Sequence, residues 1–122
     1  CIENGADTFD CVSPARVGRN GALYTRFGRV NITRAEFKND YRPFDESCEC
    51  YTCKNYSRAY LSHLFRSGEL LSNTLGTIHN EQFIVRLVDD IRQSIIDGSF
   101  QDFKRDFLKD YYAISKAKQK TE

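Results

Sequence analysis

Three cysteines lie within six residues of this 122-residue chain, and they restrict its fold more than any other feature. They are Cys48, Cys50 and Cys53. A disulfide across one or two intervening residues is strained, whereas three thiolates at this spacing can surround one tetrahedral cation. The cluster therefore predicts a zinc site whose fourth ligand comes from elsewhere in the chain.

The fourth ligand is expected to be a histidine, and the chain has two. His63 lies inside an amphipathic helical pattern, whereas His79 follows Gly-Thr-Ile and comes just before a strong helical pattern. We favour His79, and His63 remains the alternative. A closed, thiolate-rich site is typical of structural zinc, because hydrolytic zinc keeps one position open for water. The metal would pin the segment after the cysteines to the segment around the histidine.

Length and composition predict one small globular unit, with 40% hydrophobic and 29% charged residues. No apolar run approaches the roughly 20 residues that a helix needs to span a bilayer. The chain lacks methionine and starts at Cys1, which indicates a piece of a longer protein or removal of a signal peptide. Clustered thiols favour metal ligation in a reducing cytosol over disulfides in a secreted protein, so we expect a cytoplasmic location.

The formal net charge of +1 hides a basic stretch between Cys11 and Ala35 that contains no acidic residue. Its arginines are Arg16, Arg19, Arg26, Arg29 and Arg34. Such a stretch predicts either contact with phosphate or RNA, or a solvated basic loop. Charge alone does not decide between the two.

The first third of the chain has the pattern of short strands and turns. Residues 7–12 predict a strand, and the run Gly18–Gly21 predicts a sharp turn. Residues 22–25 and 29–32 predict a hairpin around Phe27-Gly28. Residues 33–47 are polar and irregular and lead to the cysteine cluster.

From the cysteines onward the apolar period changes to that of helices. We expect one helix over 54–66 ended by Gly68, an apolar helical stretch from Leu70 towards His79, and a further helix over 83–95 ended by Gly98. Ser99 is expected to cap a last helix with an aromatic stripe at Phe100, Phe103, Phe107 and Tyr111. From Ser115 the chain is polar and lysine-rich, and we expect it to fray.

These motifs in this order resemble the C-terminal part of bacterial-type tRNA-guanine transglycosylases, also called queuine tRNA-ribosyltransferases. The resemblance extends from Gly5 to Tyr112. It is carried by Phe9-Asp10-Cys11-Val12, by Pro-Ala-Arg-Val-Gly-Arg-Asn-Gly from Pro14 to Gly21, by the three cysteines with His79-Asn80, and by Ser57-Arg58-Ala59-Tyr60. The chain departs from the family at Ser13-Pro14-Ala15, where leucine, proline and threonine are common, which affects the fine contacts of that loop.

The resemblance implies an α/β fold, the C-terminal portion of a (β/α)8 TIM-type barrel with a zinc-binding subdomain, in which this chain is mostly helical with a short β-hairpin. It implies a last barrel strand region at 1–33, a zinc-binding subdomain at 34–82, C-terminal helices at 83–114 and a disordered tail at 115–122. Its zinc ligands would be Cys48, Cys50, Cys53 and His79, its nucleophile Asp10, and its wobble-base recognition segment Ala15, Arg16, Val17, Gly18 and Arg19. From the residues alone, Asp10 would be interpreted as a loop or turn-capping aspartate.

The resemblance further implies an enzyme of queuosine biosynthesis that exchanges the wobble guanine in the tRNA anticodon loop for a 7-deazaguanine through a covalent aspartate–ribose intermediate. It implies a homodimer supported by the zinc region. The general base and the residues that select the deazaguanine would lie upstream of Cys1, so this chain alone is expected to be inactive. The alternative is a non-catalytic zinc module or accessory subunit for dimerisation and tRNA binding, which the upstream sequence would distinguish.

Overall fold

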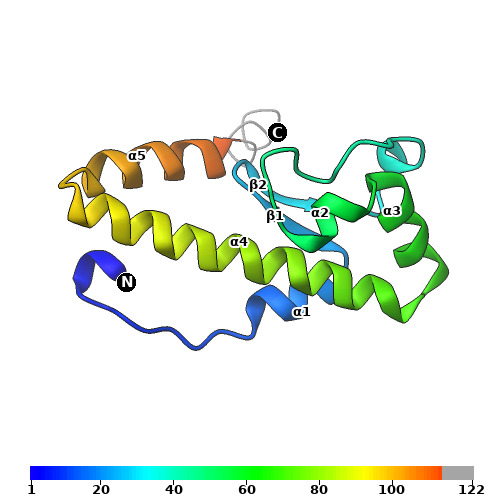
Figure 1. Cartoon of the computed structure of the whole chain (residues 1–122), viewed down its shortest axis with the longest axis horizontal. Helices are drawn as coiled ribbons and strands as arrows, with labels where there is room; N and C mark the ends of the chain where they lie inside the picture. The colour runs from blue at the N-terminus through cyan, green and yellow to red at the C-terminus, as the bar shows by residue number, and fades with distance from the viewer. Residues whose placement is uncertain (114–122) are drawn as a thin grey trace, which may run out of the picture.

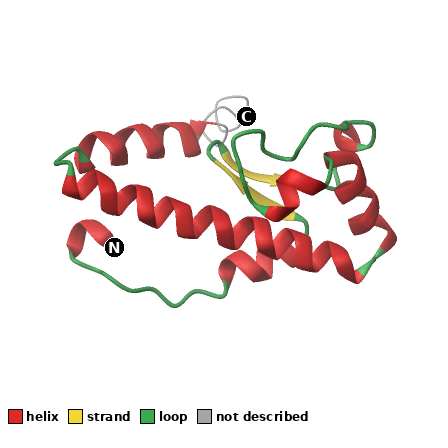
Figure 2. Ribbon diagram, in the orientation of Figure 1, coloured by secondary structure: helices red, strands yellow, loops and turns green. Residues whose placement is uncertain are grey.

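The longest helix, α4 (Leu70–Ile96), forms the axis against which the other elements pack. In the computed structural model, which describes residues 1–113, the remaining elements are η1 (Ile2–Asn4), α1 (Ser13–Arg19), β1 (Ala22–Thr25), β2 (Gly28–Asn31), η2 (Ala35–Phe37), α2 (Tyr51–Asn55), α3 (Arg58–Ser67) and α5 (Phe100–Tyr111). Figures 1 and 2 show α1, the hairpin and α2 around the N-terminal half of α4, with α5 returning along its C-terminal half. The expected helix-rich chain with a short hairpin is confirmed.

The segment before α1 is extended, but it is not a strand. Residues 6–12 have no regular secondary structure, so the strand predicted over 7–12 is wrong for this chain. A strand needs a hydrogen-bonded neighbour, and the one sheet among the described residues consists of β1 and β2 alone. The alternation of apolar residues therefore produces an extended segment without a partner.

Of the run Gly18–Gly21 that was predicted to turn, Gly18 and Arg19 belong instead to the last turn of α1. Pro14 lies in the first turn of this helix, where a missing backbone N–H costs nothing. The reversal follows at Gly21, whose φ of +78° suits glycine. The basic stretch thus begins as a helix, and the chain turns at the end of the run Gly18–Gly21 that was predicted to turn.

The hairpin is confirmed, with β1 and β2 antiparallel and Leu23 opposite Val30. Its second strand is Gly28–Asn31, one residue earlier than predicted. Leu23 and Ile32 are fully buried and belong to the core. The other buried core residues are Phe37, Phe44, Cys50, Cys53, Leu61, Leu64 and Leu75.

Two predicted helix boundaries are wrong. The single helix expected over 54–66 is α2 followed by α3, because Tyr56 is extended and the Ser57 Oγ accepts a hydrogen bond from the Tyr60 N–H to start α3. The two helical stretches expected on either side of His79 are one continuous helix, α4, which contains no proline to interrupt it.

The glycine stops predicted after α3 and α4 are confirmed, since Gly68 and Gly98 have φ of +70° and +73°. Ser99 is the N-cap residue of α5, but its side chain does not cap that helix and instead contacts the Ser94 carbonyl. The tail predicted to fray, 115–122, lies outside the described residues. Across residues 1–113, every helix is too short or too polar to cross a membrane.

Candidate metal centre and active-site segment

Three elements bring the four predicted metal ligands together. Cys48 comes from the loop before α2, Cys50 and Cys53 from the start of α2, and His79 from the middle of α4. All four ligand atoms lie within 4.8 Å of one another. His63 is exposed on α3 and is not part of this group, so the histidine that lies with the three cysteines is His79.

The distances fit a tetrahedral ion. The His79 Nδ1 lies 3.7 Å from the Cys48 Sγ, 3.5 Å from the Cys50 Sγ and 3.4 Å from the Cys53 Sγ. Zinc bonds of about 2.3 Å to sulfur and about 2.0 Å to nitrogen at tetrahedral angles place the two ligand atoms about 3.6 Å apart. The group can therefore hold a metal ion, and its size and soft donors are consistent with zinc.

The hairpin fixes the orientation of the histidine ring. The His79 Nε2 lies 2.8 Å from the Tyr24 carbonyl oxygen, which can only accept, so this nitrogen carries the proton and Nδ1 is free to ligate. The edge of the Phe44 ring packs against the imidazole, with ring centres 4.9 Å apart. The His79 side chain is fully buried.

The start of α2 directs the sulfurs of Cys50 and Cys53 towards the His79 ring. Cys50 is the N-cap residue of α2, and its Sγ accepts a hydrogen bond from the Cys53 N–H. The Thr52 hydroxyl donates to the Leu75 carbonyl on α4 at 2.7 Å, which ties the two helices together one turn before His79. A metal in this group would therefore close a junction that protein contacts already form.

Cys50 and Cys53 differ in how readily their thiols ionise. Hydrogen bonds from the Cys48 and Cys53 thiols lower the pKa of the Cys50 thiol, and the corresponding contacts with burial raise the pKa of Cys53. Of these two thiols, Cys50 is thus the one that ionises first. Ligation by all three sulfurs releases the remaining protons, which makes metal affinity fall as the pH is lowered.

The residues expected to act on RNA lie in α1 and in the segment before it. In the sequence they precede the hairpin, whereas the cysteines follow it. Asp10 is exposed in the extended segment. Arg16 and Arg19 are exposed on α1, whereas Gly18 is buried against α4. Ala15 and Val17 are half-buried on the same helix.

Sequence reasoning missed three groups that complete this region. The Tyr24 carbonyl orients His79, the Thr52 hydroxyl joins α2 to α4, and the buried Asn80 side chain bonds to α1 and β1. A backbone carbonyl has no signature in the sequence. Asn80 stands out in the sequence only through its place directly after the candidate ligand His79.

Fold and ligand set together define a Cys3His module, built on a hairpin and a long helix, that can hold a metal ion. The family model described as queuine tRNA-ribosyltransferase matches residues 1–113. Curated proteins named queuine tRNA-ribosyltransferase are similar to this chain over nearly its whole length. One from Thermodesulfovibrio yellowstonii is 50% identical over 93% of the chain and 31% of its own length. One from Dehalococcoides mccartyi is 51% identical over 95% of the chain and 30% of its own.

The chain belongs to the queuine tRNA-ribosyltransferase family. It spans about three tenths of the length of these curated relatives.

Proposed function

We propose that this chain is the metal-bearing C-terminal part of a tRNA-guanine transglycosylase, which exchanges the wobble guanine of tRNA for a 7-deazaguanine. The observation that carries the proposal is the membership of a family whose relatives are named ribosyltransferases, together with an exposed carboxylate just ahead of an arginine-bearing helix. A tRNA substrate also places the enzyme in the cytoplasm, in agreement with five free cysteines.

Asp10 is the proposed nucleophile. Its side chain makes no ion pair or hydrogen bond with any of residues 1–113, so its carboxylate is free to meet a substrate. Attack of a carboxylate oxygen on C1′ of the wobble nucleotide forms a C–O bond and breaks the C1′–N9 bond, and guanine leaves with a proton taken from a general acid of the complete protein. The incoming deazaguanine then returns a proton to that group, forms the new N9–C1′ bond and expels the carboxylate. Two displacements restore the original anomeric configuration.

The segment Ala15, Arg16, Val17, Gly18 and Arg19 is the proposed contact with the anticodon loop. Arg16 and Arg19 are exposed on α1 and are not paired with an acid of the described residues. Unpaired guanidinium groups suit both phosphate oxygens and guanine edges. Their position in the last turn of α1 also favours the helix itself, because cations stabilise a helix C-terminus.

The proposed metal is a structural zinc ion held by Cys48, Cys50, Cys53 and His79. With four protein ligands the ion would have no position for a substrate or water, so its contribution is to the fold. In the complete protein, residues 6–12 would pair with neighbouring strands as a strand of a (β/α)8 barrel. Catalytic groups of such barrels lie at the C-terminal ends of strands, which is where Asp10 would then be.

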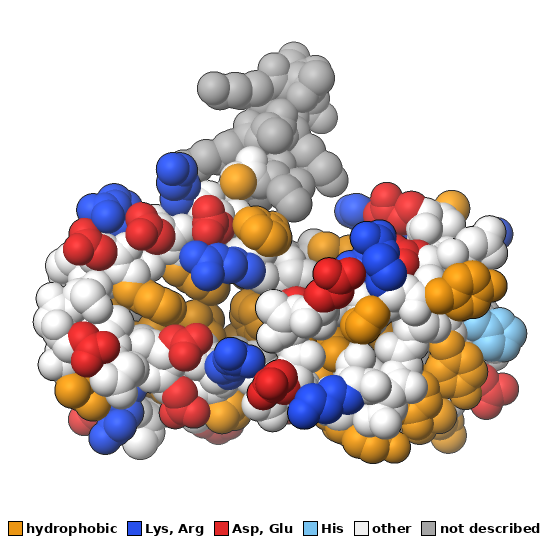
Figure 3. All heavy atoms as spheres, turned by 45° about the horizontal axis from the view of Figure 1, so that its top comes forward, with side chains coloured by type: hydrophobic (Ala, Val, Ile, Leu, Met, Phe, Trp, Pro, Cys, Tyr) orange, Lys and Arg blue, Asp and Glu red, His pale blue; other side chains and the backbone are white. Residues whose placement is uncertain are grey.

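The proposed homodimer would use a tyrosine surface next to the metal group, made of Tyr41, Tyr51, Tyr56 and Tyr60. Tyr56 stacks on Tyr60 with ring centres 5.6 Å apart and meets Tyr51 edge to face at 5.9 Å. Tyr41, Tyr51 and Tyr60 are 79%, 57% and 43% exposed. Figure 3 shows hydrophobic side chains gathered at the end of the molecule that carries α3 and the start of α4. Stacked, exposed tyrosines are typical anchors of protein interfaces.

The test is base exchange by the complete protein, of the length its relatives have, with the Asp10→Asn variant beside it. The native protein should exchange guanine in tRNA and leave a protein–tRNA adduct that resists denaturation. Asp10→Asn keeps the size of the side chain and removes its charge, so it should bind tRNA but form no adduct.

Asp7→Asn is the matched control, since it removes an exposed carboxylate from the same extended segment and should leave both readouts unchanged. Native-rate exchange or adduct formation by Asp10→Asn would assign the nucleophile elsewhere. A complete native protein that binds tRNA without exchanging any base would instead support an accessory, non-catalytic role.

A further inference from the structure

The Asn80 side chain is fully buried, and both of its donors and its carbonyl oxygen bond to two other elements. Its Nδ2 donates to the Pro14 carbonyl in the first turn of α1 and to the Ala22 carbonyl of β1, both at 3.0 Å. Its Oδ1 accepts from the Tyr24 N–H at 2.9 Å. One amide on α4 therefore joins the start of α1 to the start of the hairpin.

The open edge of β1 is occupied by two consecutive residues of α4. Alternate residues of a strand direct their backbone groups to opposite edges, so Ala22 and Tyr24 present theirs away from β2. Asn80 binds the Tyr24 N–H, and His79 donates to the Tyr24 carbonyl. The candidate metal ligand His79 and its neighbour Asn80 thus bind the two backbone polar groups of the same residue, Tyr24.

Two glycines bring α1 close enough for this arrangement. A Cβ added at Gly76 would lie 2.6 Å from the Gly18 carbonyl oxygen. A Cβ added at Gly18 would lie 3.0 Å from the Gly76 backbone and 3.1 Å from the Asn80 Nδ2. The helix with the proposed RNA-contacting arginines is therefore packed backbone to backbone on α4, beside the metal group.

We propose that Asn80 is a positioning residue for the reaction: through Pro14 and α1 it fixes the segment 10–19, which carries the proposed nucleophile and arginines, relative to the metal-bearing helix. This inference rests on the proposed function. Asn80 would not touch the substrate. It holds the first turn of α1 at Pro14, four residues beyond Asp10.

The test uses Asn80→Asp in the complete protein. The aspartate keeps the shape and the acceptor for the Tyr24 N–H, but it replaces the two donors with an oxygen that faces the Pro14 and Ala22 carbonyls. Zinc content should stay at the native value, because the four ligands are unchanged. Hydrogen exchange of peptides covering 10–24 should become faster, while exchange of a peptide covering α2 should not change.

The kinetic readout separates positioning from a general loss of folded protein. Normalised to zinc-containing enzyme, kcat should fall by on the order of 100-fold, the effect expected when a reacting group is displaced by about 1 Å. Loss of folded protein alone would lower the active fraction and leave normalised kcat and KM unchanged. Asn73→Asp, the same change at a half-buried α4 position whose side chain has no hydrogen bond among the described residues, should behave as the native protein.

Gly18→Ala provides a second route if the buried aspartate prevents folding, since its added carbon pushes α1 away from Gly76 and Asn80. It should show the same faster exchange over 10–24 and the same loss of kcat. Native exchange protection, or native normalised kcat with an active parent enzyme, would overturn the proposal. If the native protein has no base-exchange activity, the proposed function fails, and the exchange data alone decide whether Asn80 fixes this segment.

Discussion

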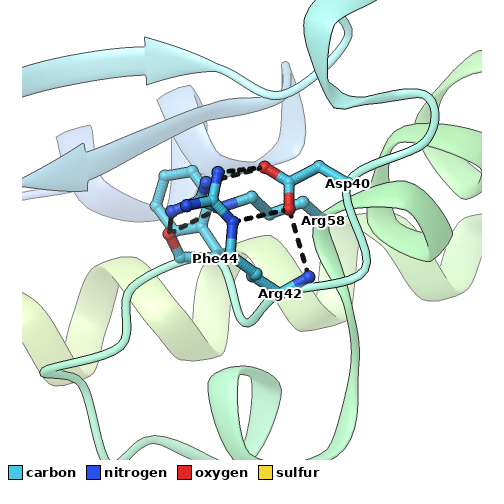
Figure 4. A network of polar contacts seen from close by, with 4 residues as sticks. All are labelled: Asp40, Arg42, Phe44 and Arg58. Carbon is cyan, nitrogen blue, oxygen red and sulfur yellow. Dashed lines mark hydrogen bonds and ion pairs between the residues drawn. The ribbon is translucent and has the colours of Figure 1, made fainter.

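The Asp40 carboxylate connects the loop before the cysteines to α3. It accepts hydrogen bonds from the guanidinium groups of Arg42 and Arg58, and Arg58 also donates to the Phe44 carbonyl, as Figure 4 shows. The Asp40 and Arg58 side chains are only 14% and 19% exposed. The bonds from Arg42 and then Arg58 hold the pKa of the Asp40 carboxyl well below its usual range. Because Phe44 packs on the His79 ring, this ion pair also supports the metal group.

A lowered pKa in the folded protein makes this contribution to stability depend on pH. The contribution is fully present above the unfolded-state pKa of about 3.9 and is lost as the pH falls through the folded value. Asp40→Asn should therefore lower the free energy of unfolding at pH 7, and the difference from the native protein should shrink below about pH 4. Denaturant titrations at a series of pH values measure it. Asp102→Asn, an exposed carboxylate paired with Arg105, should have a smaller effect, and a difference for Asp40→Asn that is as large at pH 2 as at pH 7 would contradict this account.

The residues of the metal group could be predicted from the sequence. The hydrogen bonds that hold them in place could not. Three thiols at this spacing are typical of a metal site, so the sequence predicts Cys48, Cys50 and Cys53 as ligands. The helical pattern that follows His79 favours this histidine as the fourth. The bonds of His79 to a carbonyl of the hairpin and of Asn80 to α1 depend on how distant segments pack. Such pairings have no local pattern in a single sequence.

Helices α2 and α3, the junction between them and the preceding loop carry the proposed dimer surface. The break between them at Tyr56 turns that ring towards both Tyr51 and Tyr60. A continuous helix over this stretch, as the sequence predicted, would set the start of α3 at a different angle to α2. The irregular junction is therefore what assembles the stacked rings.

Replacing Tyr51 by alanine in the complete protein should weaken the dimer, because aromatic anchors in interfaces contribute about 2 kcal/mol, or roughly 30-fold in Kd. Sedimentation equilibrium measures the change. Phe27→Ala removes a ring of nearly equal exposure, 56% against 57%, from the hairpin turn, and should leave the Kd unchanged. Equal dimer affinity for Tyr51→Ala and the native protein would place the interface elsewhere. A native protein that sediments as a monomer would contradict the proposed homodimer.

The elements that sequence periodicity identified are those with a strong local cause. The hairpin follows from Phe27-Gly28, and α3 and α4 end at Gly68 and Gly98, where a positive φ is required. Periodicity failed where the partner lies far away in the sequence. The extended residues before α1 have no neighbouring strand in this chain, and α4 continues through His79 because its buried residues there are held by β1 and α2.

Across the described molecule, the metal group is the point at which the hairpin, α2 and α4 meet. The apolar core next to it is small and consists largely of residues from short elements. Structural zinc contributes about 10 kcal/mol or more of folding free energy, which is comparable to the roughly 5–15 kcal/mol of total stability of a typical domain. Removal of the metal should therefore unfold the segment 48–79, and with it the support of α1.

Zinc content tests the account most directly, measured on the complete protein purified without chelator. We predict about one zinc per chain at the Cys3His group, none in Cys53→Ala, which should also be poorly soluble, and the native amount in His63→Ala, whose histidine is exposed on α3. Native protein without zinc and with Cys48, Cys50 and Cys53 in disulfides would contradict the account.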